Sequence, residues 1–188
     1  MASIFRRYES TIYGNYRRAY ALGGAATGLL MVAATWLYGI VSGERLAEPY
    51  NYVGEIALTV GMIVAAYLYR KRLPDGKVTL KELMLLELGI GLIAAIVYGL
   101  WIWLYSGSIA PDMVEVYNRY RVAQIPEGDD VEQYRRAVDL TLQYTSGDWA
   151  FIAGFRTWVF SILPNFFIAL LLRTEKAPVR SKPPKDNN

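Results

Sequence analysis

The chain has 188 residues, of which 54% are hydrophobic and 14% aromatic, and its formal net charge is +3. It contains no cysteine and no histidine, which excludes disulfides, thiolate nucleophiles, the commonest general base and the commonest transition-metal ligand. The apolar residues form long blocks that are nearly free of charge, which is typical of membrane spans. The sequence therefore predicts an all-α integral membrane four-helix bundle, without a cofactor and without a nucleic-acid partner.

The first predicted span covers residues 19–42. No charged residue occurs between Ala19 and Gly43, and this stretch exceeds the roughly 20 residues that a helix needs to cross the hydrocarbon core. The preceding segment, Met1 to Arg18, carries four arginines among its tyrosines. It predicts a short amphipathic lead-in that lies at the membrane surface.

The second and third predicted spans cover residues 52–69 and 82–105. Between them lies Pro74-Asp75-Gly76, a turn sequence in which proline sets its own φ and glycine accepts a positive φ. Thr79 and Glu82 then form a capping-box pattern at the start of the third helix. These spans are therefore predicted to be an antiparallel pair joined by a tight turn.

The outer loop is predicted to cover residues 106–148. Two apolar stripes at helical spacing predict a helical hairpin there, with Asp129 or Asp130 as the N-cap of its second helix. The fourth span covers residues 149–172 and contains Pro164. Residues 1–172 then form a single domain, and the polar, proline-rich segment 173–188 is predicted to be a disordered tail.

The distribution of Lys and Arg predicts the orientation of these spans. The N-terminal segment carries four, the turn from Arg70 to Glu82 five and the tail from Arg173 five, against one and four in the two opposite loops. Because cytoplasmic loops carry the excess of basic residues, both termini are predicted to be cytoplasmic. The predicted location is the inner (plasma) membrane of a bacterium, which the chain crosses several times.

Small residues recur every four positions on three of the predicted spans, which lets helix backbones approach closely in lipid. We favour packing within the bundle as their role, and a self-association face is the alternative. The residues are Gly24 and Gly28 on the first span, Ala57, Gly61 and Ala65 on the second, and Gly91, Ala95 and Gly99 on the third.

Three ionisable residues lie within the apolar spans, where each is costly unless it is paired or near an interface. Glu55 and Arg156 lie at matching depths near the outer ends of their helices, which predicts an ion pair between the second and fourth spans. The alternative is that each side chain reaches the outer headgroups separately. Glu87 is predicted to form an interfacial salt bridge with Arg70 or Arg173, and a proton-carrying carboxylate is its alternative role.

The middle of the chain resembles a family of small bacterial four-span membrane proteins that is catalogued as a domain of unknown function. The resemblance extends from about Leu22 to Leu172 and implies a four-helix membrane bundle, with no activity, cofactor or catalytic residue to carry over. Glu87 and the tyrosine-rich outer loop depart from the family pattern. The residues that carry the resemblance are Tyr69-Arg70-Lys71, Gly76, Gly89, Gly91, Ile93, Tyr98, Tyr105 and Pro111-Asp112.

Three functions are compatible with these features. The favoured one is a non-enzymatic accessory or assembly protein whose partners are the lipid bilayer and either a second copy of itself or another membrane protein. The second is a small oligomeric carrier or channel that uses Glu55, Glu87 and Arg156. The third is a membrane-embedded enzyme with the acidic outer loop around Asp129 and Asp130 as its active site.

Overall fold

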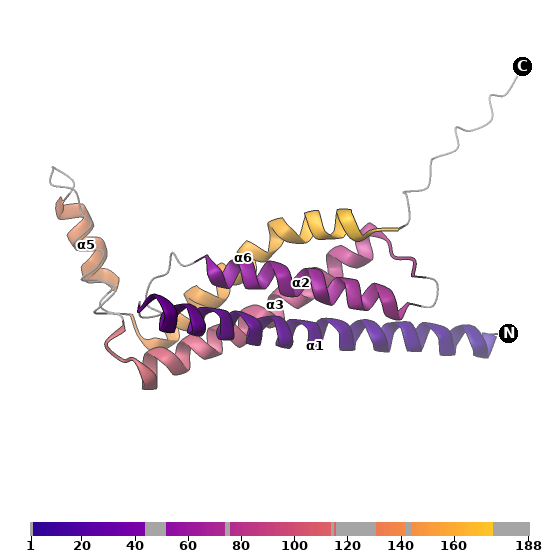
Figure 1. Cartoon of the computed structure of the whole chain (residues 1–188), viewed down its shortest axis with the longest axis horizontal. Helices are drawn as coiled ribbons and strands as arrows, with labels where there is room; N and C mark the ends of the chain where they lie inside the picture. Colours follow the sequence, from indigo (N-terminus) through magenta and orange to yellow (C-terminus); the bar gives the residue numbers. More distant parts are fainter. Residues whose placement is uncertain are drawn as a thin grey trace, which may run out of the picture.

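The computed structural model describes residues 2–43, 52–73, 76–113, 115, 131–141 and 144–174. Four long helices pack side by side, and the fold of the described residues is all-α (Figure 1). A short π-helical segment, η1, extends α3. The helices are α1 (Ala2–Ser42), α2 (Val53–Arg72), α3 (Leu80–Leu104), η1 (Tyr105–Ile109), α5 (Val131–Thr141) and α6 (Ser146–Leu172).

The helices of the bundle are long and apolar enough to cross a membrane. The four candidate spans are Tyr16–Ser42, Val53–Arg72, Leu80–Ile109 and Ser146–Leu172. Their outward faces carry large apolar side chains, such as Leu29, which is 62% exposed. Soluble proteins rarely expose contiguous apolar surface of this kind, whereas lipid solvates it. The chain is accordingly a multi-pass membrane protein with four candidate spans.

The packing order of the helices places α3 at the centre of the contacts. It lies against α1 and α6 along much of its length, while α2 packs mainly on α1 and reaches α6. The core between them is formed by buried residues such as Met62, Leu86 and Ile90, each 0% exposed. We call the end where η1 ends and α6 begins the loop end, and the opposite end the terminal end.

Helix α1 is longer than predicted. The segment 2–18 does not form a separate lead-in at the membrane surface, because it is continuous with the first span in a single helix from Ala2 to Ser42. The first proline of the chain is Pro49, and Gly14 alone does not end the helix. Figure 1 shows α1 running past the terminal ends of α2, α3 and α6 towards the N-terminus.

The turn between α2 and α3 follows its predicted chemistry only in part. Gly76 has a φ of +59°, which is the left-handed conformation that favours glycine. Thr79 caps α3 by accepting a hydrogen bond of 3.2 Å from the amide of Glu82. The Glu82 carboxylate, however, accepts a hydrogen bond from the hydroxyl of Tyr69 instead of completing the capping box. Pro74 and Asp75 lie outside the described residues.

The predicted outer hairpin can be compared with the structure only in its second half. Helix α5, Val131–Thr141, begins directly after Asp129 and Asp130, which lie outside the described residues together with most of the predicted first helix. Helix α6 begins at Ser146, slightly earlier than predicted, because Thr145 and Asp148 form a complete capping box there. Figure 1 shows α5 beyond the loop end of the bundle.

The terminal end is closed by an unpredicted contact. Thr174 donates its amide to the carbonyl of Val78 at 3.1 Å, and its hydroxyl accepts from the amide of Val78 at 2.8 Å. The residue after Arg173 is therefore bonded to the α2–α3 turn, and the disorder of the segment that follows stays a prediction. Residues 175–188 lie outside the described part of the chain.

Candidate functional site

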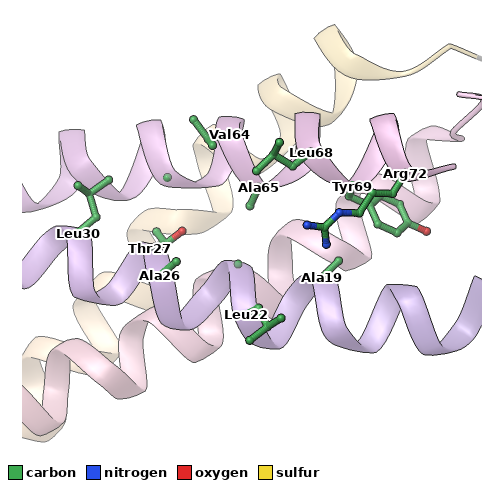
Figure 2. A pocket seen from close by; sticks show the side chains of 12 residues that line it. Ala19, Leu22, Ala26, Thr27, Leu30, Val64, Ala65, Leu68, Tyr69 and Arg72 are labelled. Atoms are coloured by element: carbon green, nitrogen blue, oxygen red, sulfur yellow. The ribbon is translucent and has the colours of Figure 1, made fainter.

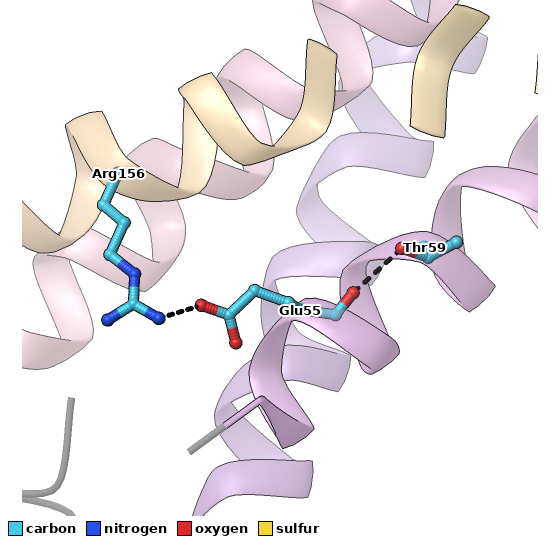
Figure 3. A network of polar contacts seen from close by, with 3 residues as sticks. All are labelled: Glu55, Thr59 and Arg156. Atoms are coloured by element: carbon cyan, nitrogen blue, oxygen red, sulfur yellow. Dashed lines mark hydrogen bonds and ion pairs between the residues drawn. The ribbon is translucent and has the colours of Figure 1, made fainter. Parts of the chain in front are cut away.

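The clearest polar contact between spans joins α2 to α6. Nη2 of Arg156 lies 2.5 Å from Oε1 of Glu55, and the two side chains are 31% and 20% exposed respectively (Figure 3). The guanidinium also lies over the ring of Phe160, 5.5 Å from its centroid. A charge-assisted bond of this kind lowers the cost of placing both ions among apolar helices.

The helix register brings these two charges together. Glu55 is in the first turn of α2, whereas Arg156 is ten residues after Ser146, or roughly 15 Å along α6. The start of α6 therefore extends beyond the start of α2 at the loop end. The hydroxyl of Thr59 bonds to the carbonyl of Glu55 at 2.9 Å, one turn further along the same helix.

Glu87 is in a different environment from Glu55. Its side chain is 0% exposed, and neither carboxylate oxygen has a hydrogen-bond partner among the described residues. The predicted salt bridge with Arg70 or Arg173 is therefore wrong. The prediction failed because of the face of α3 on which Glu87 lies. Glu87 shares this face with the buried Leu83 and Ala94, and the face points into the bundle.

A polar stripe on α6 was missed by sequence reasoning. Thr157, Ser161 and Asn165 recur every four residues and are 4%, 0% and 4% exposed. The amide Nδ2 of Asn165 donates to the carbonyl of Met84 on α3 at 3.2 Å, whereas its Oδ1 has no partner within the described residues. The four-residue spacing was the available signal, because such a spacing places residues on one face of a helix.

The predicted small-residue positions lie at helix contacts inside the bundle. A Cβ atom added to Gly24 would be 2.5 Å from the Cβ of Ile93 on α3, so that no larger residue fits without a shift. Ala57 and Ala95 are 7% and 3% exposed, and Ala65 packs against the core. The remaining contacts pair Gly28 with Val97, Gly61 with Thr27, Gly91 with Ser161, and Gly99 with Ala150.

A comparison with known protein families identifies the chain. Residues 23–174 match the family described as "Protein of unknown function (DUF4199)". The chain belongs to this family. The match confirms the resemblance predicted between about Leu22 and Leu172. No curated protein and no solved structure matches the chain, so the function of this DUF4199 protein has to be argued from its own residues.

Two apolar grooves lie between the helices of the DUF4199 bundle. One, of about 280 Å³, runs between α1 and α2, with Ala26 and Ala65 among its small lining residues and Arg72 near one end (Figure 2). The other, of about 380 Å³, lies between α3 and α6 beside Trp103 and Phe155. An apolar groove that ends at a cation has the chemistry to hold an acyl chain beside an anionic headgroup.

The described part of this DUF4199 protein contains no group of three or more Asp, Glu, His or Cys residues that could hold a metal ion. The acidic positions Asp129 and Asp130 lie outside the described residues. The polar groups that the described core offers are the Glu55–Arg156 ion pair, the buried Glu87 carboxyl group, and the hydroxyls and amide of the α6 stripe.

Proposed function

We propose that this DUF4199 protein is a non-enzymatic accessory protein of a membrane complex, and that the projecting part of α1 is its contact arm. The observation that carries the proposal is that α1 is one helix from Ala2 to Ser42, whereas its uncharged stretch begins only at Ala19. The arm extends past the terminal ends of the other three spans (Figure 1). Short helices are marginal by themselves and gain most of their stability from packing, which suits an arm that binds a partner.

The sequence of the arm supports a helical partner. Tyr16 packs against the bundle core, and its spacing continues backwards through Ile12, Tyr8 and Phe5, three or four residues apart. Residues at this spacing share one helix face. The apolar spacing of the sequence therefore continues towards the N-terminus of α1, and a helix of a partner membrane protein is the occupant that we propose for this stripe.

The proposed orientation places the arm in the bacterial cytoplasm and the span region in the inner membrane. It is supported by the fourteen Lys and Arg residues on the terminal side against five on the loop side. The chain contains no cysteine, so that single cysteines at Ser10, Gln133 and Ser181 report sidedness directly. We expect an impermeant thiol reagent to label Gln133→Cys in intact spheroplasts, and Ser10→Cys and Ser181→Cys only after lysis.

The accessory role is tested by extracting the tagged protein in native lipid discs and measuring the mass of each particle and its components. We expect one partner at fixed stoichiometry with the full chain. Deletion of residues 2–14 should remove the partner, whereas deletion of residues 176–188, which shortens the other terminus by a similar length, should leave it bound. A particle that contains only this chain, or a partner retained after deletion of the arm, would contradict the proposal.

A second candidate function, a small oligomeric carrier or channel, is favoured by the buried Glu87 and the Glu55–Arg156 pair. Ionisable groups inside a span often mark an ion pathway. Proteoliposomes containing the purified protein provide the test, with proton flux measured by an internal pH-sensitive dye. Flux that is lost in Glu87→Gln would favour the carrier, whereas liposomes no leakier than protein-free ones would exclude it.

A further inference from the structure

The bundle core contains an imbalance of hydrogen-bond acceptors. An ionised Glu87 offers only acceptors, and so does Oδ1 of Asn165. Neither has a donor among the described residues, although Glu87 is 0% and Asn165 4% exposed. Buried polar atoms are normally hydrogen-bonded, and an unpaired buried charge is more costly than an unpaired neutral group. Two unsatisfied acceptor groups on facing helices therefore require an explanation.

The helix register places these groups at one level of the bundle. The carbonyl of a helical residue points towards the amide four residues later, so the carbonyl of Met84 lies beside Glu87 and Leu88. Nδ2 of Asn165 is 3.2 Å from that carbonyl oxygen. Gly91 is one turn after Glu87 on α3, and it lies against Ser161 of α6. Ser161 is one turn before Asn165 on α6, which runs antiparallel to α3. Glu87 is thus on the segment of α3 that faces Ser161 and Asn165.

We propose that Glu87 and Asn165 form a proton-binding site in the core of the bundle. One proton from hydronium, which is released as water, forms an O–H bond with a carboxylate oxygen of Glu87, and this O–H donates a hydrogen bond to Oδ1 of Asn165. A single proton thereby removes the buried charge and supplies the donor that Oδ1 of Asn165 lacks, and the carbonyl oxygen that remains on Glu87 is a neutral acceptor, which is less costly to bury than a charge. The site does not depend on the accessory role, and it would serve a carrier equally well.

The surroundings favour a proton over a metal cation. A hard cation such as Ca²⁺ takes six to eight oxygen ligands, whereas the described residues contain no group of three or more Asp, Glu, His or Cys side chains that could hold one. Glu87 lines neither of the two grooves described above, and a proton needs no cavity.

The titratable groups that pack against the same core are tyrosines. α1 contributes Tyr16 and Tyr20, α2 contributes Tyr69, whose hydroxyl is bonded to Glu82, and α3 contributes Tyr98. α6 contributes the neutral Ser161 and Asn165 to this region. None of these elements supplies a cation that bonds to Glu87 in the described part of the chain.

Infrared difference spectroscopy of the protein in lipid discs tests the site. We expect one carbonyl absorption of a protonated carboxylic acid at neutral pH, which shifts in D₂O and is lost in Glu87→Gln. Glu82→Gln is the matched control, because it removes a carboxylate from the same helix and should leave the absorption intact. In Asn165→Leu the absorption should persist at higher frequency, since its hydrogen-bond acceptor has been removed.

Three results would overturn the proposal. The first is an absorption that is absent from the wild type or that survives in Glu87→Gln. The second is an absorption that disappears when sodium chloride replaces choline chloride at constant pH, which would indicate a metal cation instead of a proton. The third is an absorption whose frequency is unchanged in Asn165→Leu. This variant also tests the hydrogen bond between Glu87 and Asn165 if Glu87→Gln fails to fold.

Discussion

Glu55 and Glu87 are the two carboxylates that interrupt apolar stretches of the sequence, and the structure treats them differently. Glu55 is close to the start of α2, has a partly exposed side chain and is 2.5 Å from the guanidinium of Arg156. Glu87 is 0% exposed on the inward face of α3, and no described residue bonds to it. The same residue type thus forms an ion pair at the loop end and an unpaired group in the core.

The difference between them teaches that an intramembrane carboxylate can be stabilised by two separate means. At the loop end an opposite charge compensates Glu55, and partial exposure reduces the cost of desolvation. In the core no described residue offers a cation that bonds to Glu87, so that a shared proton is the stabilisation that we propose for it. The predictions below test this contrast in order of decreasing expected effect.

The largest effect is expected when Glu55 is deprived of its partner. In Arg156→Leu, Glu55 would be a carboxylate without its cationic partner, as Glu87 would be if it were ionised. Breaking a buried pair costs about 3–5 kcal/mol, and partial exposure of this pair places our expectation near the lower limit, at about 3 kcal/mol. The free energy of unfolding in mixed micelles is the measurement. A loss below about 0.5 kcal/mol, the size of an exposed pair, would remove the distinction between the two carboxylates.

A smaller loss of unfolding free energy is expected at Gly91, where α3 packs against α6. A Cβ atom at Gly91 would overlap the side chain of Ser161, and overpacking of this kind costs about 1–3 kcal/mol. We expect Gly91→Ala to reduce the free energy of unfolding accordingly, and to do so less when Ser161→Gly provides the room. Equal losses in both backgrounds would show that this contact does not hold the helices near Glu87.

Exchanging the charges of the ion pair sharpens the comparison further. The double variant Glu55→Arg with Arg156→Glu should be more stable than the two single variants predict by addition. For residues in contact, we expect a coupling free energy of about 1 kcal/mol or more. A double-variant cycle measured under the conditions used for Arg156→Leu provides this number. Additive losses would mean that each charge reaches the membrane surface by itself.

The smallest effect is expected at Glu87 itself. Glu87→Gln replaces a protonated carboxylic acid by a neutral amide of nearly the same shape, which can still donate to Asn165. We expect the free energy of unfolding to change by about 0.5 kcal/mol or less, in contrast to Arg156→Leu, because volume-conserving changes are tolerated best. A loss of 2 kcal/mol or more, about that of breaking a charged network, would indicate that Glu87 is ionised and bonded.

Much of the fold follows from local sequence patterns. Four long apolar stretches with at most a few charges predicted the helices, because the length of each stretch can be compared directly with the width of the hydrocarbon core. The cap at Thr79 and the left-handed conformation of Gly76 were also predictable from the sequence, since both depend on residues that are close in sequence. The straight continuation of α1 to Ala2 was missed because the sequence change at Arg17 and Arg18 resembles a helix boundary.

The candidate site was predictable only in part. A prediction of matching depth suggested that Glu55 and Arg156 meet, and the structure brings them together although Arg156 is farther from the start of its helix than Glu55 is. The same reasoning placed Glu87 near Arg70 or Arg173, since depth alone does not say which way a side chain points. Asn165 was not predicted, because its partner is the carbonyl of Met84, a group that every residue possesses.

The sequence by itself determined that this DUF4199 protein has four apolar helices, where each helix lies along the chain and which residues are small enough for close contact. The tertiary structure alone decided that Gly91 faces Ser161, that Asn165 bonds to α3 and that Glu87 points into the core. The physical reason is that apolarity is summed along one helix, whereas a side-chain contact depends on the rotation and axial shift of two helices together. A rotation of one residue, about 100°, is enough to turn an interfacial carboxylate into a buried one.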